Sequence, residues 1–230
     1  MTVCQSLSEI ILRIRGLWAC SGISIRIPIS LQIWNRSPRC VLKRIILSEV
    51  AKLFDPLGFL DPIIVIAKLI LQDLWQLIIQ WDESVPQNIH TRWIAFRSQM
   101  GDLNQLKIPR CVKLNAHQSI VEMHGFCDAN QRAFGACIYL CTKLGLNDHH
   151  SELLCSRSRV APLKTVSLAR LELSAALLLA HLINKVRESL ELSKCPTYLW
   201  SDSTIALNWI TSPRGGSQFL WQIWWAKFSA

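Results

Sequence analysis

The sequence predicts an α/β protein in which a mostly helical region precedes a mixed sheet with helices packed on it. Half of the 230 residues are hydrophobic, which is ample for one sizeable core or two smaller ones. The spacing of the apolar residues changes from about 3.6 to about 2 after Ile108-Pro109, which sets a domain boundary at about residue 112. Beyond it we expect the order strand, strand, strand, helix, strand, helix, a pattern typical of the α/β class.

The region before the boundary is expected to be helical from residue 43 to residue 111. Residues 1–42 show no sustained period and stay unassigned. Ser48 is expected to cap a short helix, because a serine hydroxyl can accept a hydrogen bond from a free backbone N–H of the first turn. The turn sequence Asp55-Pro56-Leu57-Gly58 then ends this helix.

Two longer amphipathic helices are expected next. The first runs from Pro62 to about Ile79, since proline is tolerated in the first turn, and the second from about Asn88 to Leu103. The apolar residues of the first recur at steps of three and four and predict a wide buried face: Ile63, Ile66, Leu69, Ile70, Leu74, Leu77 and Ile78. The second presents Ile89, Trp93, Phe96 and Met100.

Three strands are expected after the boundary. Ile120–Asp128 and Ala133–Thr142 alternate in the manner of strands and are joined by the polar turn Asn130-Gln131-Arg132. Leu153–Val160 is the third strand. A meander is the simplest arrangement of the three.

A long helix, a short strand and a last helix complete the pattern. The long helix is expected from Leu168 to Leu190, with Ser167 as its cap. Thr197–Trp200 predicts a short buried strand, and Ser203 is expected to cap a helix that runs through Ile210. The apolar stripe of the long helix consists of Leu171, Ala175, Leu178, Leu182 and Val186.

The charge balance favours a polyanionic partner. Lys and Arg total 25 against 16 Asp and Glu, a formal net charge of +9, which suits nucleic acid or an anionic membrane surface. The most apolar run, 63–81, contains Lys68, Gln72 and Asp73, so it is too interrupted for a spanning helix of ~20 nearly uncharged residues. We therefore expect no membrane segment.

The nine cysteines are odd in number and scattered, which is typical of reduced, mostly buried thiols in an intracellular protein. No Cys-x-x-Cys pair is present, so a structural zinc site is not expected. His149 and His150 follow Cys141 closely, but no second pair with ligand spacing accompanies them, and a polar loop is the preferred interpretation.

Three acidic residues occupy places where an acid is a poor structural choice. Asp128 ends one apolar strand, Asp202 ends another, and Glu172 lies in an almost wholly apolar stretch of the long helix. Alone, an Asp at a strand end is more often a turn or cap residue, and a Glu early in a helix more often serves a favourable interaction with the helix dipole. Strand ends and a helix crossing the sheet can nevertheless bring the three acids to one point. Such a cluster needs cations, and magnesium prefers hard oxygen ligands. Two such ions would activate water toward a phosphodiester.

Four segments resemble, in the right order, the ribonuclease H region of BEL/Pao-type retrotransposon polyproteins: His124–Asn130 (HGFCDAN), Arg159–Lys164 (RVAPLK), Leu168–Leu173 (LARLEL) and Trp200–Ser203 (WSDS). Upstream, Ile46–Leu60 (ILSEVAKLFDPLGFL) resembles the segment that links reverse transcriptase to this nuclease. The resemblance covers about residues 43–213. It implies a reverse-transcriptase connection-like region at 43–111 and a ribonuclease H-like domain at 112–213.

The resemblance implies hydrolysis of RNA in RNA/DNA hybrids by two Mg²⁺ ions held by Asp128, Glu172 and Asp202. Recognition would rest on backbone shape and 2′-hydroxyl contacts. The polar residues beside the acids are the candidate nucleic-acid contacts: Asn130, Arg132, Ser203 and Thr204. The implied partners are the hybrid or another nucleic acid and the remainder of the polyprotein. The implied location is intracellular, in the cytoplasm, a virus-like particle or the nucleus.

The sequence departs from this family at its end. Related domains carry a fourth acidic ligand farther along, and the tail 214–230 lacks the family pattern, so we expect a C-terminally truncated fragment with weak or absent nuclease activity. Two alternatives stay open. One is an aspartic peptidase, since this region also carries a retrotransposon peptidase label, although no Asp here begins the Asp-Thr/Ser-Gly motif that such enzymes use. The other is a noncatalytic remnant that binds nucleic acid.

Overall fold

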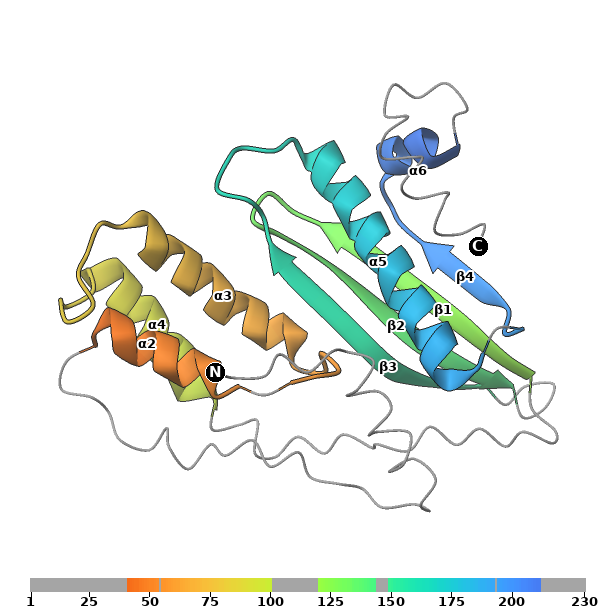
Figure 1. Cartoon of the computed structure of the whole chain (residues 1–230), viewed down its shortest axis with the longest axis horizontal. Helices are drawn as coiled ribbons and strands as arrows, with labels where there is room; N and C mark the ends of the chain where they lie inside the picture. Colours follow the sequence, from red (N-terminus) through yellow and green to blue (C-terminus); the bar gives the residue numbers. More distant parts are fainter. Residues whose placement is uncertain (1–40, 54, 101–119, 144–148, 193, 212–230) are drawn as a thin grey trace, which may run out of the picture. The chain divides into compact units, whose positions relative to one another are not determined.

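The computed structural model describes residues 41–53, 55–100, 120–143, 149–192 and 194–211 (Figure 1). The chain divides into two compact units, Met1–Lys113 and Leu114–Ala230. Most of the unassigned stretch 1–42 and the whole tail 214–230 lie outside the described residues. The finer division into 1–42, 43–111, 112–213 and 214–230 stays a prediction.

The described part of the first unit consists of three helices: α2 (Lys43–Ala51), α3 (Asp61–Gln76) and α4 (Gln87–Gln99). Ser48 lies inside α2, whose N-cap is Leu42, so the predicted cap at Ser48 is wrong. The helix begins earlier because its apolar face extends back toward Val41, which is buried. The core shared by these helices consists of Val41, Ile46, Ala67, Ile70, Leu74, Val85, Ile89, Trp93, Phe96 and Met100.

The predicted apolar faces of α3 and α4 had different outcomes. All four residues predicted for α4 are buried. On α3 the prediction was too wide, because Ile66 is 46% exposed, and Ile78 lies beyond the end of the helix and is fully exposed. Buried Ala67, Ile70 and Leu74 form a narrow stripe, since α3 packs on helices from one side.

The predicted turn between α2 and α3 is confirmed and is fixed by one carboxylate. The side chain of Asp55 accepts hydrogen bonds from the backbone N–H groups of Gly58, Phe59 and Leu60 at 3.0, 3.0 and 2.6 Å. Gly58 has a φ of 79°, a left-handed conformation that favours glycine. The turn therefore supplies partners for N–H groups at the start of α3.

A buried ion pair joins α2 to α4. Arg97 Nε lies 3.5 Å from Glu49 Oε2, and both residues are only 8% exposed. Burial raises the pKa of Glu49, and the nearby positive charge of Arg97 opposes that rise. Removing either partner would leave a charge in a medium that solvates it poorly.

The second unit contains a four-stranded mixed sheet in the order β3-β2-β1-β4, which confirms the predicted α/β class (Figure 1). Its strands are β1 (Ile120–Ala129), β2 (Ala133–Lys143), β3 (His149–Val160) and β4 (Thr197–Trp200). The meander of β1, β2 and β3 is antiparallel, and β4 pairs with β1 in parallel. Asn130 closes the first turn, where its Oδ1 accepts from the N–H groups of Arg132 and Ala133 at 2.8 Å.

Two details of the sheet differ from the sequence prediction. β3 begins at His149, so His149 and His150 belong to a strand that pairs with the end of β2 and not to a loop. The strand Thr197–Trp200 is present but is not buried: Tyr198, Leu199 and Trp200 are 40–51% exposed. β4 is an edge strand of the described sheet and has a neighbour on one side only.

One long helix, α5 (Leu168–Leu190), crosses one face of the sheet (Figure 1). All five residues of its predicted apolar stripe are buried. The helix lies so close to β1 that a Cβ added at Gly125 would stand 2.7 Å from Leu179 Cδ1 and 2.9 Å from Ile183 Cδ1. Ser167 occupies the predicted N-cap position, but its side chain makes no capping hydrogen bond.

The last described helix, α6 (Thr204–Thr211), begins directly after the loop that follows β4. The hydroxyl oxygen of Ser203 accepts a hydrogen bond from the N–H of Ala206 at 3.2 Å, as the cap prediction requires. Among the described helices, none is both long enough and apolar enough to cross a bilayer. The five described cysteines are free thiols.

Candidate metal centre

Three different elements bring Asp128, Glu172 and Asp202 to one end of the sheet. Asp128 is the penultimate residue of β1, and Asp202 stands two residues beyond β4. Because β1 and β4 run parallel, their carboxyl ends meet at the same edge. Glu172 is in the second turn of α5, the helix that covers β1. The local pattern of each element therefore fixes where its acid lies.

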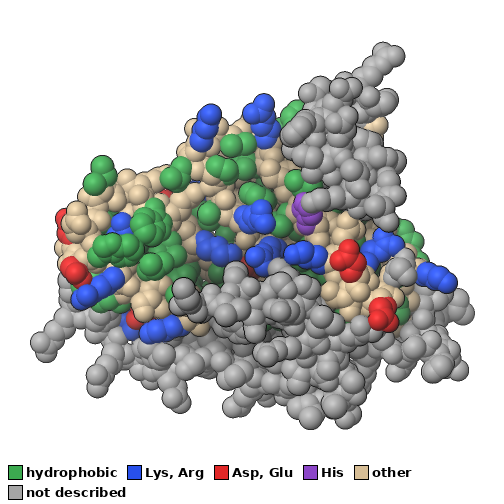
Figure 2. Space-filling model, viewed as in Figure 1, with side chains coloured by type: hydrophobic (Ala, Val, Ile, Leu, Met, Phe, Trp, Pro, Cys, Tyr) green, Lys and Arg blue, Asp and Glu red, His purple; other side chains and the backbone are tan. Residues whose placement is uncertain are grey.

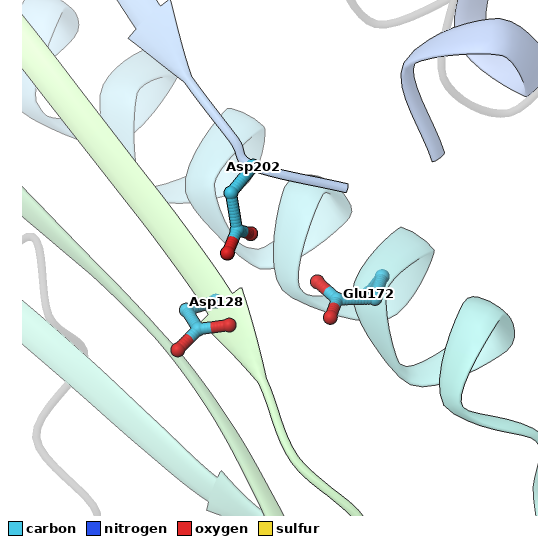
Figure 3. Close-up of side chains that lie close together, drawn as sticks. All are labelled: Asp128, Glu172 and Asp202. Carbon is cyan, nitrogen blue, oxygen red and sulfur yellow. The ribbon is translucent and has the colours of Figure 1, made fainter. Parts of the chain in front are cut away.

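The three carboxylates converge. One oxygen from each of Asp128, Glu172 and Asp202 lies within 4.8 Å of the others, and Figure 3 shows the side chains pointing toward one another. Asp128 and Asp202 are exposed, whereas Glu172 is only 8% exposed. The cluster thus has one buried acid beneath two that face solvent.

Glu172 is poorly stabilised as an anion by the protein alone. Its Oε2 is buried and has no hydrogen-bond partner among the residues that the structure describes. Burial raises the pKa of Glu172, and the charges of Asp128 and Asp202 raise it further. An orphaned carboxylate oxygen within a set of hard oxygen donors fits a divalent cation, which would offset both the desolvation and the repulsion.

A buried thiol borders the cluster. Burial, with smaller contributions from the three acids, raises the pKa of Cys127 to about 11, so the thiol stays protonated at neutral pH. Its Sγ lies 3.6 Å from the carbonyl oxygen of Trp200. Cys127 therefore acts as a packing residue that holds the ends of β1 and β4 together.

The four polar residues predicted to contact nucleic acid all lie at this end of the sheet, although the described contacts give two of them structural roles. Asn130 and Ser203 are engaged in the turn and the cap described above. Arg132 and Thr204 are exposed. Their assignment as nucleic-acid contacts stays a prediction.

The sequence analysis assigned no role to two further residues at this end, Arg157 and Arg159, although Arg159 begins the motif Arg159–Lys164. The registers align Asp128 with Gly135 on β2 and Gly135 with Ser158 on β3. The two arginines flank Ser158 and are both exposed. The signal was present in the alternation Ser-Arg-Ser-Arg of residues 156–159, since residues two apart on a strand share a face.

Comparison with known proteins gives one family match and similar solved structures. A family model described as "Pao retrotransposon-like RNaseH-like domain" matches residues 42–203. Two structures of foamy virus protease-reverse transcriptase with double-stranded DNA, one of a form designated dRH, are each 14% identical. Their TM-scores are 0.47 and 0.45, over 91% and 89% of this chain. The chain spans 34% and 39% of the length of those proteins. No curated protein matches it.

Proposed function

Because the chain belongs to the Pao retrotransposon-like RNaseH-like domain family, we propose that its second unit is a metal-dependent nuclease domain acting on RNA in RNA/DNA hybrids. The observation that carries the proposal is the convergence of Asp128, Glu172 and Asp202 within 4.8 Å, together with the buried Oε2 of Glu172, which has no hydrogen-bond partner in the described part of the chain. The first unit is the helical segment that connects this domain to the rest of a polyprotein.

Asp128, Glu172 and Asp202 would hold the metal, which we take to be two Mg²⁺ ions because all three donors are carboxylates. When bound, the metal activates a water molecule and stabilises the leaving oxygen of a phosphodiester. The protein provides a fixed arrangement of anions on three rigid elements. The exposed Asp128 and Asp202 leave the solvent side open to a phosphate, and Glu172 anchors the cluster from α5.

A cleavage assay with the whole chain tests this function. The purified protein is incubated with an end-labelled RNA/DNA hybrid in Mg²⁺ or in EDTA, and Asp128→Asn is run in parallel. This variant keeps the size of the side chain and removes the charge. We expect slow cleavage in Mg²⁺ that is lost in EDTA and in the variant. Equal cleavage by Asp128→Asn would refute the role of the acidic cluster.

The same assay separates the alternatives. A noncatalytic remnant would bind the hybrid and leave it intact in Mg²⁺. An aspartic peptidase needs two carboxylates that share one proton, and it would cleave a peptide substrate without metal. The described cluster contains a third, buried carboxylate from a helix, which suits a multivalent cation better than a shared proton.

A further inference from the structure

Resting on the proposed function, we propose that Arg157 and Arg159 on β3 are positioning residues that bind backbone phosphates of the same nucleic acid whose scissile phosphodiester lies at the acidic cluster. The sequence motifs and the family match do not assign this role to either arginine. The proposal depends on their register, on their exposure and on the absence of an acidic partner for either among the described residues.

The sheet places Arg157 and Arg159 on either side of Ser158, the residue of β3 in the row of Asp128. Asp128, Gly135 and Ser158 are successive partners across β1, β2 and β3. Strands are spaced about 4.8 Å apart, so Ser158 lies about 10 Å from Asp128. Measured along the axis of a duplex, the backbone charges of one strand follow one another about every 3.4 Å, so ~10 Å of axis spans about three phosphate steps. A phosphate at the cluster therefore places neighbouring phosphates within reach of β3.

Both guanidinium groups stand on the side of the sheet that carries α5. Arg157 pairs with Ala136 and Arg159 with Phe134 on β2, and paired residues project to the same face. Every second residue of β2 from Ala136 to Thr142 is buried, on the face of the sheet that α5 covers. β3 is an edge strand of the described sheet, and Arg157 and Arg159 on it are exposed to solvent. Figure 2 shows the exposed Lys and Arg side chains of one face of the molecule in blue.

The two arginines are available to an anion. Both are exposed, and no ion pair in the described residues involves either guanidinium group. They are two residues apart, so they stand about 7 Å from each other on one face. The predicted contact Arg132 belongs to the same end, since its carbonyl oxygen accepts from the N–H of Ala161, directly after β3, at 2.8 Å. Planar guanidinium groups suit bidentate contacts to phosphate.

Charged residues on an edge strand also have a simpler use, because they discourage pairing with another chain. The salt dependence of nucleic-acid binding separates the two roles. Each phosphate neutralised by the protein steepens the decrease of log affinity with log salt by roughly one unit. Edge protection alone leaves this slope unchanged.

The test measures binding of a labelled RNA/DNA hybrid to the whole chain in EDTA at several salt concentrations, so that the result is independent of cleavage. The variant is Arg157→Gln/Arg159→Gln. The matched control is Lys185→Gln/Lys194→Gln, which removes the same charge from exposed positions. Lys185 lies 13 residues beyond Glu172 on α5, roughly 20 Å along the helix. Melting curves verify that all proteins fold.

We expect Arg157→Gln/Arg159→Gln to bind the hybrid about tenfold more weakly and to reduce the slope of log affinity against log salt by roughly two units. Arg157→Lys/Arg159→Lys should largely restore both the affinity and the slope. The control should match the wild type. Equal effects in variant and control, or none in either, overturn the inference. If the wild type binds the hybrid but does not cleave it in Mg²⁺, the nuclease function is refuted. The binding assay then still tests the role of the arginines, because it does not depend on cleavage. A wild-type chain that binds no hybrid overturns the inference directly.

Discussion

Replacing Glu172 with Gln tests the physical basis of the metal centre without any substrate. In the protein alone, Glu172 is a buried anion with an oxygen that lacks a partner and with two acids beside it. Gln keeps the size and removes the charge. We therefore expect Glu172→Gln to stabilise the metal-free protein, although it removes a residue that the nuclease needs.

The size of the effect follows from the geometry. Two unit charges 4.8 Å apart, the limit for these carboxylate oxygens, repel by ~3.5 kcal/mol at an effective dielectric of ~20 and by ~0.9 kcal/mol in water. Asp128 and Asp202 are exposed, so solvent screening favours the lower value for each pair. Glu172→Gln removes two such repulsions, one with Asp128 and one with Asp202. Subtracting about 1 kcal/mol for the unsatisfied amide that the variant buries leaves a net increase in stability of roughly 1 kcal/mol. This corresponds to roughly 2–4 °C in melting temperature for a chain of this size.

The pH dependence has a definite sign. Burial raises the pKa of Glu172 above its ordinary value of 4.5. A carboxyl whose pKa is higher in the folded state contributes stability to the fold while it is protonated. This stability is fully present below the pKa of the unfolded state and is lost as the pH rises through the pKa of the folded state. The advantage of Glu172→Gln in EDTA should therefore grow as the pH is raised from 4.5 toward neutrality.

Thermal unfolding in EDTA and across a Mg²⁺ titration measures both effects. The wild type should gain about 2.7 kcal/mol when Mg²⁺ reaches 100 times its dissociation constant, and the variant should gain much less. Lys185→Gln is the control, because Lys185 is an exposed residue of the same helix. The reasoning is refuted if Mg²⁺ leaves the wild-type melting temperature unchanged and Glu172→Gln is less stable than wild type in EDTA.

Three other substitutions test the fold by thermal or urea denaturation. Gly125→Ala should lower the free energy of unfolding by about 1–3 kcal/mol, because its Cβ would overlap α5 side chains. Gly135→Ala is the control and should lower it less, because the nearest atom to its Cβ is 3.4 Å away. Equal losses would contradict the close contact between α5 and β1. Arg97→Met should lower the free energy of unfolding by about 3–5 kcal/mol at pH 7, because it leaves the Glu49 carboxylate buried without its partner. The loss should shrink as the pH is lowered, because burial raises the pKa of Glu49 and favours its neutral form. A loss independent of pH would contradict the buried pair. Asp55→Ala should cost about 1–3 kcal/mol through three lost hydrogen bonds, and Asp55→Asn, which keeps one acceptor, should cost less.

The sequence predicted the elements best where one physical preference dominates. The stripe of α5 repeats at helical spacing from Leu171 to Val186, and all five residues assigned to it are buried. The turn at Asp55 combines an acid, a proline and a glycine, each of which favours a turn. Ser48 misled the prediction, because a serine that could cap a helix is also tolerated within one.

The candidate site was predictable in its residues and not in its surroundings. Asp128, Glu172 and Asp202 stood out because each is an acid in an apolar context. Arg157 and Arg159 did not, because a basic residue on a strand is ordinary until the register is known. The exposure of β4 was missed for the same kind of reason, since an apolar run has the same appearance whether the strand is central or at an edge.

By itself, the sequence determined which residues carry charge, which segments become helix or strand, and that three acids stand at the ends or beginnings of those segments. These properties are local, because they depend on neighbours within a few residues. Only the tertiary structure decided that the acids lie within 4.8 Å of one another, that Glu172 is the buried member, and that two arginines flank the residue of β3 in the row of Asp128. Strand order, register and helix packing fix these distances, and they arise from contacts between residues far apart in the chain.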